Sequence, residues 1–308
     1  MQDGKPVYHI PALLRETVDL LEVNPQGIYI DATFGGGGHS RALLQHLGPE
    51  GKLFGFDRDI DALGNAPDDP RFTFVHSDFR FMKNFMRFYG FPKVDGILAD
   101  LGVSFHHFDA PERGFSFRTE GPLDMRMNQK ASISAGKIIT EAPESELKKL
   151  LTDFTDLKAK TCADIAHKLS VVRQNEDINT TTQLAKIISP HLNPASLKKE
   201  LAQVFQAFRI ATNDEMGALK TLLTESLTLL KPGGRLAILT YHSGEDRLVK
   251  EFFKTGLTEG GRETDPIYGR PVSPWKIITK SPLVASPEEV AENPRSRSAK
   301  LRAAILKK

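Results

Sequence analysis

The chain has 308 residues, of which 40% are apolar and 26% are charged, and its formal net charge is +2. A chain of this length can bury a large core, and its near-neutral charge excludes a globally basic nucleic-acid-binding protein. No apolar run approaches the roughly 20 residues of a membrane-spanning helix, and residues 1–9 lack the layout of a signal peptide. These features predict a cytoplasmic protein with no membrane partner. The single cysteine, Cys162, excludes an internal disulfide and is expected to pack as a small apolar residue.

Residues 28 to 40 are the most informative stretch of the sequence, together with the runs that border them. A strand-like run, Gly27–Thr33, is followed by four glycines, Gly35–Gly38, and then by a helix-like run, His39–Leu47. The next strand-like run ends on Asp57, at the spacing of about 20 residues at which an acidic residue holds ribose hydroxyls. A plain glycine loop and a helix-capping Asp57 are the structural alternatives. The whole arrangement favours a nucleoside cofactor.

The class of cofactor depends on Asp31, which closes the first strand. A dinucleotide fold places a pyrophosphate against the helix that follows, and a carboxylate before the glycines would repel it. S-adenosylmethionine has no phosphate, and it carries a sulfonium and an ammonium group that a carboxylate would suit. The sequence therefore favours S-adenosylmethionine.

Strand and helix signals alternate through the first hundred residues. The strand-like runs are Gly27–Thr33, Lys52–Asp57, Arg71–Val75 and Val94–Asp100, and the helix-like runs are His39–Leu47, Ile60–Ala66 and Phe79–Tyr89. This order predicts a parallel sheet with right-handed crossovers. Ligands of such sheets bind beyond the carboxyl ends of the strands. That rim is expected to gather Asp31, Asp57, Phe79, Asp100 and His242.

The alternation stops after the fourth strand. Polar helical segments follow at Ala135–Leu151, Ala159–Arg173, Thr182–Ile188 and Ser196–Ile210. The sheet pattern then resumes with a helix at Glu215–Leu230, a turn at 231–234, a strand at Arg235–Tyr241, a helix at Glu245–Lys254, and strands at Trp275–Thr279 and Lys300–Leu306. We therefore predict a doubly wound core from 1–104 and 211–308, with a helical insertion at 105–210 that is placed to hold the substrate.

Asp100 ends the fourth strand and is the candidate catalytic residue. Methyl transfer from a sulfonium is an in-line displacement, in which a protein mainly supplies position and charge. If the acceptor is an exocyclic amine, Asp100 or a backbone carbonyl near Leu101 and Gly102 would draw its lone pair toward the methyl group. Contact with the cofactor alone, and a structural helix cap, are the alternatives for Asp100.

Two other residues have a structural and a functional interpretation. Phe79 follows His76-Ser77-Asp78 at the end of the third strand, where it suits the face of an adenine, but Asp78 as a helix cap with Phe79 in the core is equally compatible. His39 is by default a surface or packing histidine, and its position beside the glycines makes it a candidate contact to the methionine end of the cofactor.

Several segments suggest other chemistry. Ser243, with Asp246 three residues later, is a natural helix cap, and no G-x-S-x-G elbow supports a hydrolase. His106, His107 and Asp109 have a spacing that disfavours chelation, so no metal is expected. Residues 294–308 hold six Lys or Arg and no acids, which is typical of a solvated tail, of a phosphate-contacting edge, or of charges flanking a last strand.

Eight segments resemble one known family. They are His9–Glu16, Asp31–Ser40, Phe56–Asp59, Asp95–Ser104, Arg113–Met127, Phe205–Ile210, Lys231–Lys250 and Glu292–Leu301. The chain resembles the bacterial methyltransferases that modify the N4 of a cytosine in small-subunit ribosomal RNA, the RsmH/MraW family. The run Arg-Gly-Phe-Ser-Phe followed by Gly-Pro-Leu-Asp-Met-Arg-Met is far more specific than a general methyltransferase signature.

The resemblance implies a class I S-adenosylmethionine-dependent methyltransferase with an inserted helical domain. It implies S-adenosyl-L-methionine as cofactor, and 16S rRNA in the decoding region of the 30S ribosomal subunit or its late precursor as substrate. The cofactor contacts at matching positions are Gly37, Gly38, His39, Asp57, Phe79, Asp100 and His107. Gly35 and Gly36 are expected only to shape the turn. The oligomeric state is not predicted.

The chain departs from the family pattern at a few places, all in or beside the insertion. Phe105-His106 replaces a common Ser-Pro, His107 a common glutamine, and Lys199–Gln203 a frequent His-Pro-Ala-Thr-Arg, while 154–159 lacks a common Tyr-Gly-Glu. They affect substrate details more than the cofactor. Two other functions compete with methyl transfer: a nicotinamide-dependent oxidoreductase, and a non-catalytic RNA-binding or assembly factor that retains the pocket.

Overall fold

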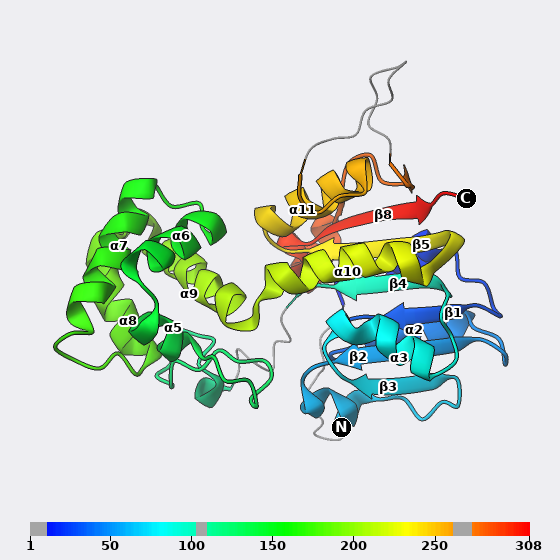
Figure 1. The fold of residues 1–308 in the computed structure, drawn as a ribbon, viewed down its shortest axis with the longest axis horizontal. Coiled ribbons are helices and arrows are strands. Elements are labelled where there is room, and N and C mark those ends of the chain that lie inside the picture. The colour runs from blue at the N-terminus through cyan, green and yellow to red at the C-terminus, as the bar shows by residue number, and fades with distance from the viewer. Residues whose placement is uncertain (1–10, 103–109, 261–272) are drawn as a thin grey trace, which may run out of the picture. The chain divides into compact units, whose positions relative to one another are not determined.

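The computed structural model describes residues 11–102, 110–260 and 273–308. The chain forms two compact units. The sheet unit consists of Met1–Gly102 and Gly217–Lys308, and the helical unit consists of Val103–Met216. The helical unit ends later than the predicted boundary at 210, because its last helix, α9, continues from Leu197 to Asn213. Each unit is described by itself below (Figure 1).

The sheet unit contains one mixed sheet with the strand order β3-β2-β1-β4-β5-β8-β6, and β7 pairs with β8. The first five strands pair in parallel, whereas β8 is antiparallel to β5, β6 and β7. The strands are β1 (Ile28–Asp31), β2 (Lys52–Asp57), β3 (Phe72–His76), β4 (Val94–Asp100), β5 (Leu230–Thr240), β6 (Trp275–Ile277), β7 (Leu283–Val284) and β8 (Lys300–Leu306). The predicted doubly wound, mostly parallel sheet is confirmed.

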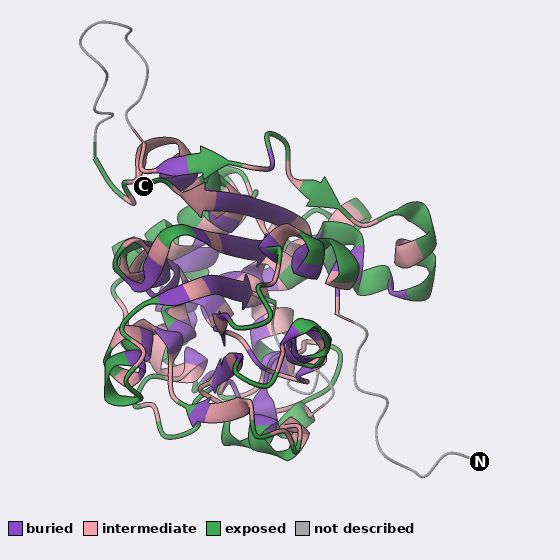
Figure 2. Cartoon of the chain, turned by 90° about the vertical axis from the view of Figure 1, so that its right-hand side faces the viewer, coloured by how far each residue is buried: buried purple, intermediate pink, exposed green. Residues whose placement is uncertain are grey.

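The sheet carries helices on both faces because alternate side chains of a strand point to opposite sides. In β4, Ile97 and Ala99 join a buried cluster with α3, α10 and α11, whereas Leu98 joins another with α1 and α2. Figure 1 shows α3 and α10 crossing in front of the strands, and Figure 2 shows the buried central strands. The helices are α1 (Leu14–Leu21), α2 (Gly38–His46), α3 (Met82–Phe88), α10 (Glu215–Leu229), α11 (Ser243–Thr255) and α12 (Pro287–Glu292), with short 3-10 turns η1 (Ile60–Asn65), η2 (Phe79–Phe81) and η6 (Pro294–Ser298).

The helical unit has its own apolar core, in which Cys162 and Leu169 of α7 pack with Leu147 of α6 and Phe208 of α9. Cys162 is fully buried, so its predicted role as a packing residue is confirmed. The elements are η3 (Pro111–Arg113), α5 (Ala135–Glu141), α6 (Glu144–Phe154), α7 (Ala159–Val172), α8 (Thr181–Ile188), η4 (Ser189–His191), η5 (Pro194–Ser196) and α9 (Leu197–Asn213).

Three local predictions differ from the structure. The helix expected at Ala135–Leu151 is broken into α5 and α6, because Pro143 supplies no N–H and the residue before it is extended. Residues Ile60–Asn65 form a 3-10 turn and not an α-helix. The turn expected at 231–234 lies inside β5 as an irregularity, because pairing with β4 moves from Leu230 directly to Arg235.

Candidate active site

A hydrogen bond joins the loop after β1 to the carboxyl end of β2. Gly35 N donates to Asp57 Oδ2 at 2.8 Å, and Asp59 N donates to Asp57 Oδ1 at 2.8 Å. Gly35 has a φ of +50°, and a Cβ built there would meet only the Thr33 carbonyl, at 3.9 Å. The side of Gly35 is therefore open. Burial raises the pKa of Asp57, while the hydrogen bonds from the two backbone N–H groups lower it.

Gly37 and Gly38 are glycines for reasons of packing within the protein. Gly37 has a φ of +71°, and a Cβ there would lie 2.7 Å from Cζ of Phe34. A Cβ on Gly38 would lie 2.2 Å from Cγ of Pro11. These contacts require glycine whether or not a cofactor touches either residue. Of these three glycines, Gly35 has the open side, although only a turn-shaping role was expected for it.

Asp31 is turned into the protein. It is 1% exposed, its Oδ2 accepts a hydrogen bond from Ser40 Oγ at 2.7 Å, and its Oδ1 accepts one from Thr33 N at 3.1 Å. Burial raises the pKa of Asp31, whereas the neighbouring His39 and these hydrogen bonds lower it. The suggestion that Asp31 offers its charge directly to the cofactor is thus not supported, because Ser40 of α2 bonds one carboxylate oxygen and the backbone of Thr33 bonds the other.

His39 and Asp100 come together at the carboxyl ends of β1 and β4. His39 is 5% exposed, so it is not a surface histidine, and its Nδ1 lies 3.8 Å from Asp100 Oδ2. Within the described ranges, no hydrogen-bond partner faces the buried Nε2 of His39. Asp100 is anchored through its backbone N–H, which donates to Thr33 Oγ1 at 2.6 Å, and Gly102 N donates to Asp100 Oδ1 at 3.3 Å. The Asp100 side chain remains 21% exposed.

Phe79 is a core residue that follows a helix cap at Asp78, which is the structural alternative stated above. Asp78 caps η2 by accepting a hydrogen bond from Arg80 N at 2.9 Å, and Phe79 lies in the core cluster with 8% exposure. A contact between Phe79 and an adenine is still a prediction, and the burial of the residue leaves little of its surface for such a contact.

The start of α11 differs from the prediction by one residue. His242, not Ser243, is the helix cap, because His242 Nδ1 accepts a hydrogen bond from Glu245 N at 3.4 Å. In return, the carboxylate of Glu245 accepts hydrogen bonds from the backbone N–H groups of Tyr241 at 2.9 Å and His242 at 3.3 Å. Asp246, expected to support the cap, instead forms an ion pair with Arg302 at 2.6 Å.

Tyr241 is the site residue that the sequence did not single out. The Tyr241 ring and Asp100 Oδ1 both lie beside Gly102. Burial, followed by the charge of Asp100, raises the pKa of Tyr241 far above its ordinary value. The phenol therefore stays protonated. The signal in the sequence was positional: Tyr241 directly follows the strand that pairs with β4 at Asp100 and Leu239.

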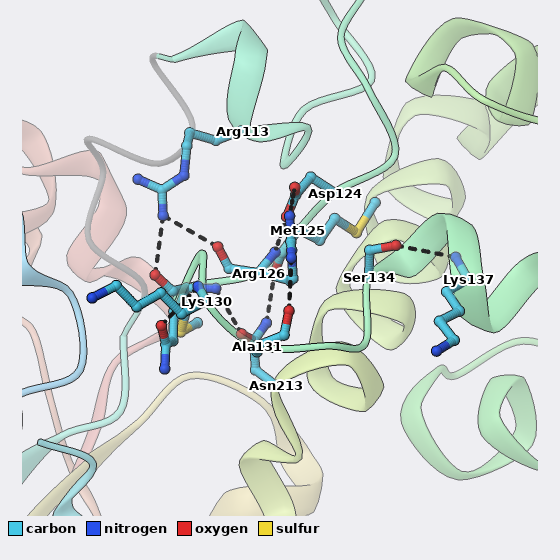
Figure 3. Close-up of polar contacts among 11 residues, drawn as sticks. Arg113, Asp124, Met125, Arg126, Lys130, Ala131, Ser134, Lys137 and Asn213 are labelled. Carbon is cyan, nitrogen blue, oxygen red and sulfur yellow. Dashed lines mark hydrogen bonds and ion pairs between the residues drawn. The ribbon is translucent and has the colours of Figure 1, made fainter.

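The most specific motif of the chain lies in the helical unit and holds an unusual backbone (Figure 3). Met125 has a φ of +56°, a conformation rarely adopted by residues with a side chain. Asn213 at the end of α9 stabilises it: Asn213 Nδ2 donates to the Met125 carbonyl at 2.8 Å, and Met127 N donates to Asn213 Oδ1 at 2.8 Å. Arg126 adds two bonds to the Asp124 carboxylate, at 2.8 and 2.6 Å.

The two glycines of this motif permit close backbone approach. A Cβ on Gly114 would lie 1.9 Å from the Pro122 carbonyl, and a Cβ on Gly121 would lie 1.9 Å from the Pro111 carbonyl. Arg113 is 6% exposed and donates to the carbonyls of residues 126 and 127. Much of the motif therefore determines the local backbone conformation of the helical unit.

His107, with Phe105 and His106, lies outside the described residues.

Among residues 11–102, 110–260 and 273–308, the structure shows no group of three or more His, Cys, Asp or Glu side chains that could hold a metal ion. In the same ranges, no helix is both long enough and apolar enough to cross a membrane.

The basic run at residues 294–308 is partly used within the protein. Arg302 is 6% exposed and paired with Asp246, which Lys300 also approaches at 3.7 Å. Lys307 Nζ donates to the Ser273 carbonyl at 2.8 Å. The interpretation as charges flanking a final strand therefore describes β8 best.

Comparison with known proteins places the chain in a family. The profile of the MraW methylase family matches residues 6–307. The ribosomal RNA small subunit methyltransferase H of Parabacteroides distasonis is 50% identical over 99% of both chains, and that of Flavobacterium johnsoniae is 50% identical over 96% of this chain and 97% of its own. The crystal structure of an rRNA methylase from Streptococcus thermophilus aligns with 96% of this chain and 94% of its own, at 12% identity and a TM-score of 0.41. From the family profile and the full-length relatives, and not from that weak structural likeness, the chain belongs to the MraW methylase family.

Proposed function

We propose that this protein transfers a methyl group from S-adenosylmethionine to the N4 amine of a cytosine in 16S ribosomal RNA. The family is one of methylases, and relatives of the same length are named ribosomal RNA small subunit methyltransferases. The observation that carries the proposal is the exposed part of the Asp100 carboxylate, which stands at the end of β4 beside the loop after β1.

The residues present fit the cofactor. The buried Nε2 of His39 has no hydrogen-bond partner among the described residues, and it lies on a ring whose other nitrogen faces Asp100. The open side of Gly35 leaves room for a ligand against the backbone. Asp57 has lone pairs left for ribose hydroxyls after accepting two backbone N–H groups. From the family resemblance, Gly37, Gly38, His39, Asp57, Phe79, Asp100 and His107 are proposed as cofactor contacts, and the open side of Gly35 is compatible with a ligand there.

When bound, S-adenosylmethionine supplies a methyl carbon whose bond to sulfur breaks as a bond to the amine nitrogen forms. The protein's part is to hold the amine in line with that bond. We assign Asp100 the role of hydrogen-bond acceptor for the amine, so that the nitrogen lone pair points at the methyl carbon. The amine becomes acidic once methylated, and its proton leaves afterwards without the need for a dedicated base.

The RNA partner is proposed to be the 30S subunit or its late precursor. The helical unit, which includes the motif around Met125, is the proposed substrate-recognition unit. A methylase acting on ribosomal RNA works where ribosomal subunits are assembled, which in bacteria is the cytoplasm.

The test is methyl transfer in vitro. Purified protein with labelled S-adenosylmethionine is mixed with 30S subunits that lack the modification, and label in cytosine N4 is the expected result. Label-free RNA at saturating cofactor would instead favour a binding or assembly factor. A thermal-shift comparison separates the other rival, because stabilisation by NADH and not by S-adenosylhomocysteine would indicate an oxidoreductase.

A further inference from the structure

The short turn η6 precedes the last strand at the edge of the sheet where Asp100 lies. Asp100 is in register with Leu239 of β5, and Leu239 is in register with Leu301 of β8. Neighbouring strands lie about 4.8 Å apart, so the start of β8 is roughly 10 Å from the backbone of Asp100. Because β8 runs antiparallel to β5, the residues before Lys300 leave the sheet at the carboxyl ends of the parallel strands. The turn η6 therefore lies beside the proposed reaction site.

The backbone of η6 is held in place by its middle residue. Ser296 is fully buried, and its Oγ donates to the Asn293 carbonyl at 2.8 Å. The N–H of Ser296 donates to the same carbonyl at 2.9 Å, and Ala299 N donates to the Ser296 carbonyl at 2.9 Å. Arg295 and Arg297, on either side of this buried serine, are both exposed. The turn therefore presents two guanidinium groups from a hydrogen-bonded backbone.

The charges around η6 favour an anionic partner at this turn. Residues 293–302 contain four Arg or Lys and no acid. Lys300 and Arg302 both lie within ion-pair distance of Asp246, whereas Arg297 forms no ion pair with a carboxylate among the residues that the structure describes. The preceding helix α12 carries three glutamates, so the basic surface is confined to the turn. A surface of this size fits one or two phosphate groups.

We propose that Arg295 and Arg297 bind phosphates of the ribosomal RNA strand beside the target cytosine. The inference rests on the proposed function, because a cytosine that reaches Asp100 brings its own backbone within a few nucleotides of η6. A guanidinium matches two phosphate oxygens with parallel N–H donors. Such contacts read no base and set the position of the strand. An acidic ribosomal protein is the rival partner, and RNA is favoured because the target strand itself must lie at this edge of the sheet.

The first test measures the binding of the protein, saturated with S-adenosylhomocysteine, to 30S subunits that lack the modification, over a range of salt concentrations. Arg297→Ala is expected to weaken the affinity about fivefold and to reduce the slope of log affinity against log salt by about 1. Arg295→Ala combined with Arg297→Ala is expected to weaken it roughly 25-fold and to reduce the slope by about 2. Arg297→Lys retains the charge and should retain most of the slope.

Two controls separate this role from a structural one. The affinity for S-adenosylhomocysteine, and kcat at saturating 30S subunits, should be unchanged in the arginine variants. Arg87→Ala is the matched change, because Arg87 is an exposed arginine in the last turn of α3, which leads to the amino end of β4 at the opposite edge of the sheet. It should leave the affinity for 30S subunits and the salt slope unchanged.

Hydroxyl-radical footprinting of 16S rRNA in the same complexes distinguishes RNA from a ribosomal protein. The double variant is expected to lose protection of nucleotides next to the target cytosine. Weaker binding with an unchanged RNA footprint would assign the arginines to a ribosomal protein and overturn the inference. Wild-type affinity and salt slope in the double variant would overturn it as well. Both measurements follow binding, so a wild-type protein that binds 30S subunits without transferring methyl refutes the proposed function separately.

Discussion

The side-chain amide of Asn213 stabilises the left-handed backbone conformation of Met125 by hydrogen bonds on both sides of it. Its Nδ2 donates to the Met125 carbonyl and its Oδ1 accepts from Met127 N, each at 2.8 Å, and all three residues are at least nine-tenths buried. A backbone of this kind costs of the order of 1–3 kcal/mol and persists only where its surroundings determine it. The two hydrogen bonds of the Asn213 side-chain amide hold the Met125 backbone in this conformation (Figure 3).

We therefore expect Asn213→Ala to lower the free energy of unfolding of the protein by about 3 kcal/mol, because it leaves buried backbone groups without partners. Chemical denaturation monitored by circular dichroism measures this. Asn175→Ala is the control, since the exposed side chain of Asn175 makes a long hydrogen bond, from its Nδ2 to Val171 O at 3.4 Å. If the two variants were equally stable, the hydrogen bonds of the Asn213 side chain would make no net contribution to the free energy of unfolding.

Gly38→Ala is expected to destabilise the sheet unit by about 2 kcal/mol through steric overlap with Pro11. Gly64→Ala is the matched change, because a Cβ at Gly64 meets nothing within 4 Å. Thermal unfolding of both variants gives the comparison. A Gly38→Ala protein as stable as the Gly64→Ala protein would contradict the packing reason given for Gly38.

Asp57→Ala is expected to weaken binding of S-adenosylhomocysteine by roughly 10- to 100-fold, because it removes the proposed ribose contact and releases the N–H of Gly35. Isothermal titration calorimetry measures the dissociation constant. Asp69→Ala serves as the control, since Asp69 precedes β3 and pairs with Arg71. Unchanged affinity in Asp57→Ala would exclude this carboxylate from the cofactor site.

The buried Asp31 predicts a pH dependence of stability. Burial raises the pKa of Asp31 above its ordinary value of 3.8, so the folded protein binds this proton more tightly than the unfolded chain. The contribution of Asp31 to the free energy of unfolding is therefore greatest below the ordinary value, and it falls as pH rises through the raised pKa. Asp31→Asn cannot titrate, so the wild type should lose stability relative to this variant as the pH rises above about 4 and through the raised pKa. A constant difference across that range would contradict the shift.

The sequence predicted the sheet well because its strands are apolar runs bounded by turn residues. It placed β2, β4 and β8 at their observed bounds. It also predicted that Asp57 and Asp100 would share a rim, because the carboxyl ends of parallel strands lie on one edge.

The remaining differences depend on tertiary contacts that a pattern does not contain. Asp31 resembles a ligand-facing carboxylate until Ser40 is seen to reach back to it. The requirement for glycine at position 38 comes from Pro11, and Tyr241 lies near Asp100 beside Gly102 although the two residues are far apart in the sequence. The cap at His242 and not at Ser243 depends on the direction of the Glu245 side chain, which spacing alone does not give.

The most direct test of the central claim is nucleoside mass spectrometry of 16S rRNA from bacterial cells that lack this protein. The account predicts that N4-methylated cytosine is lost, that the wild-type gene restores it, and that a gene carrying Asp100→Ala does not. An unchanged N4-methylcytosine signal in the cells that lack the protein would contradict the account.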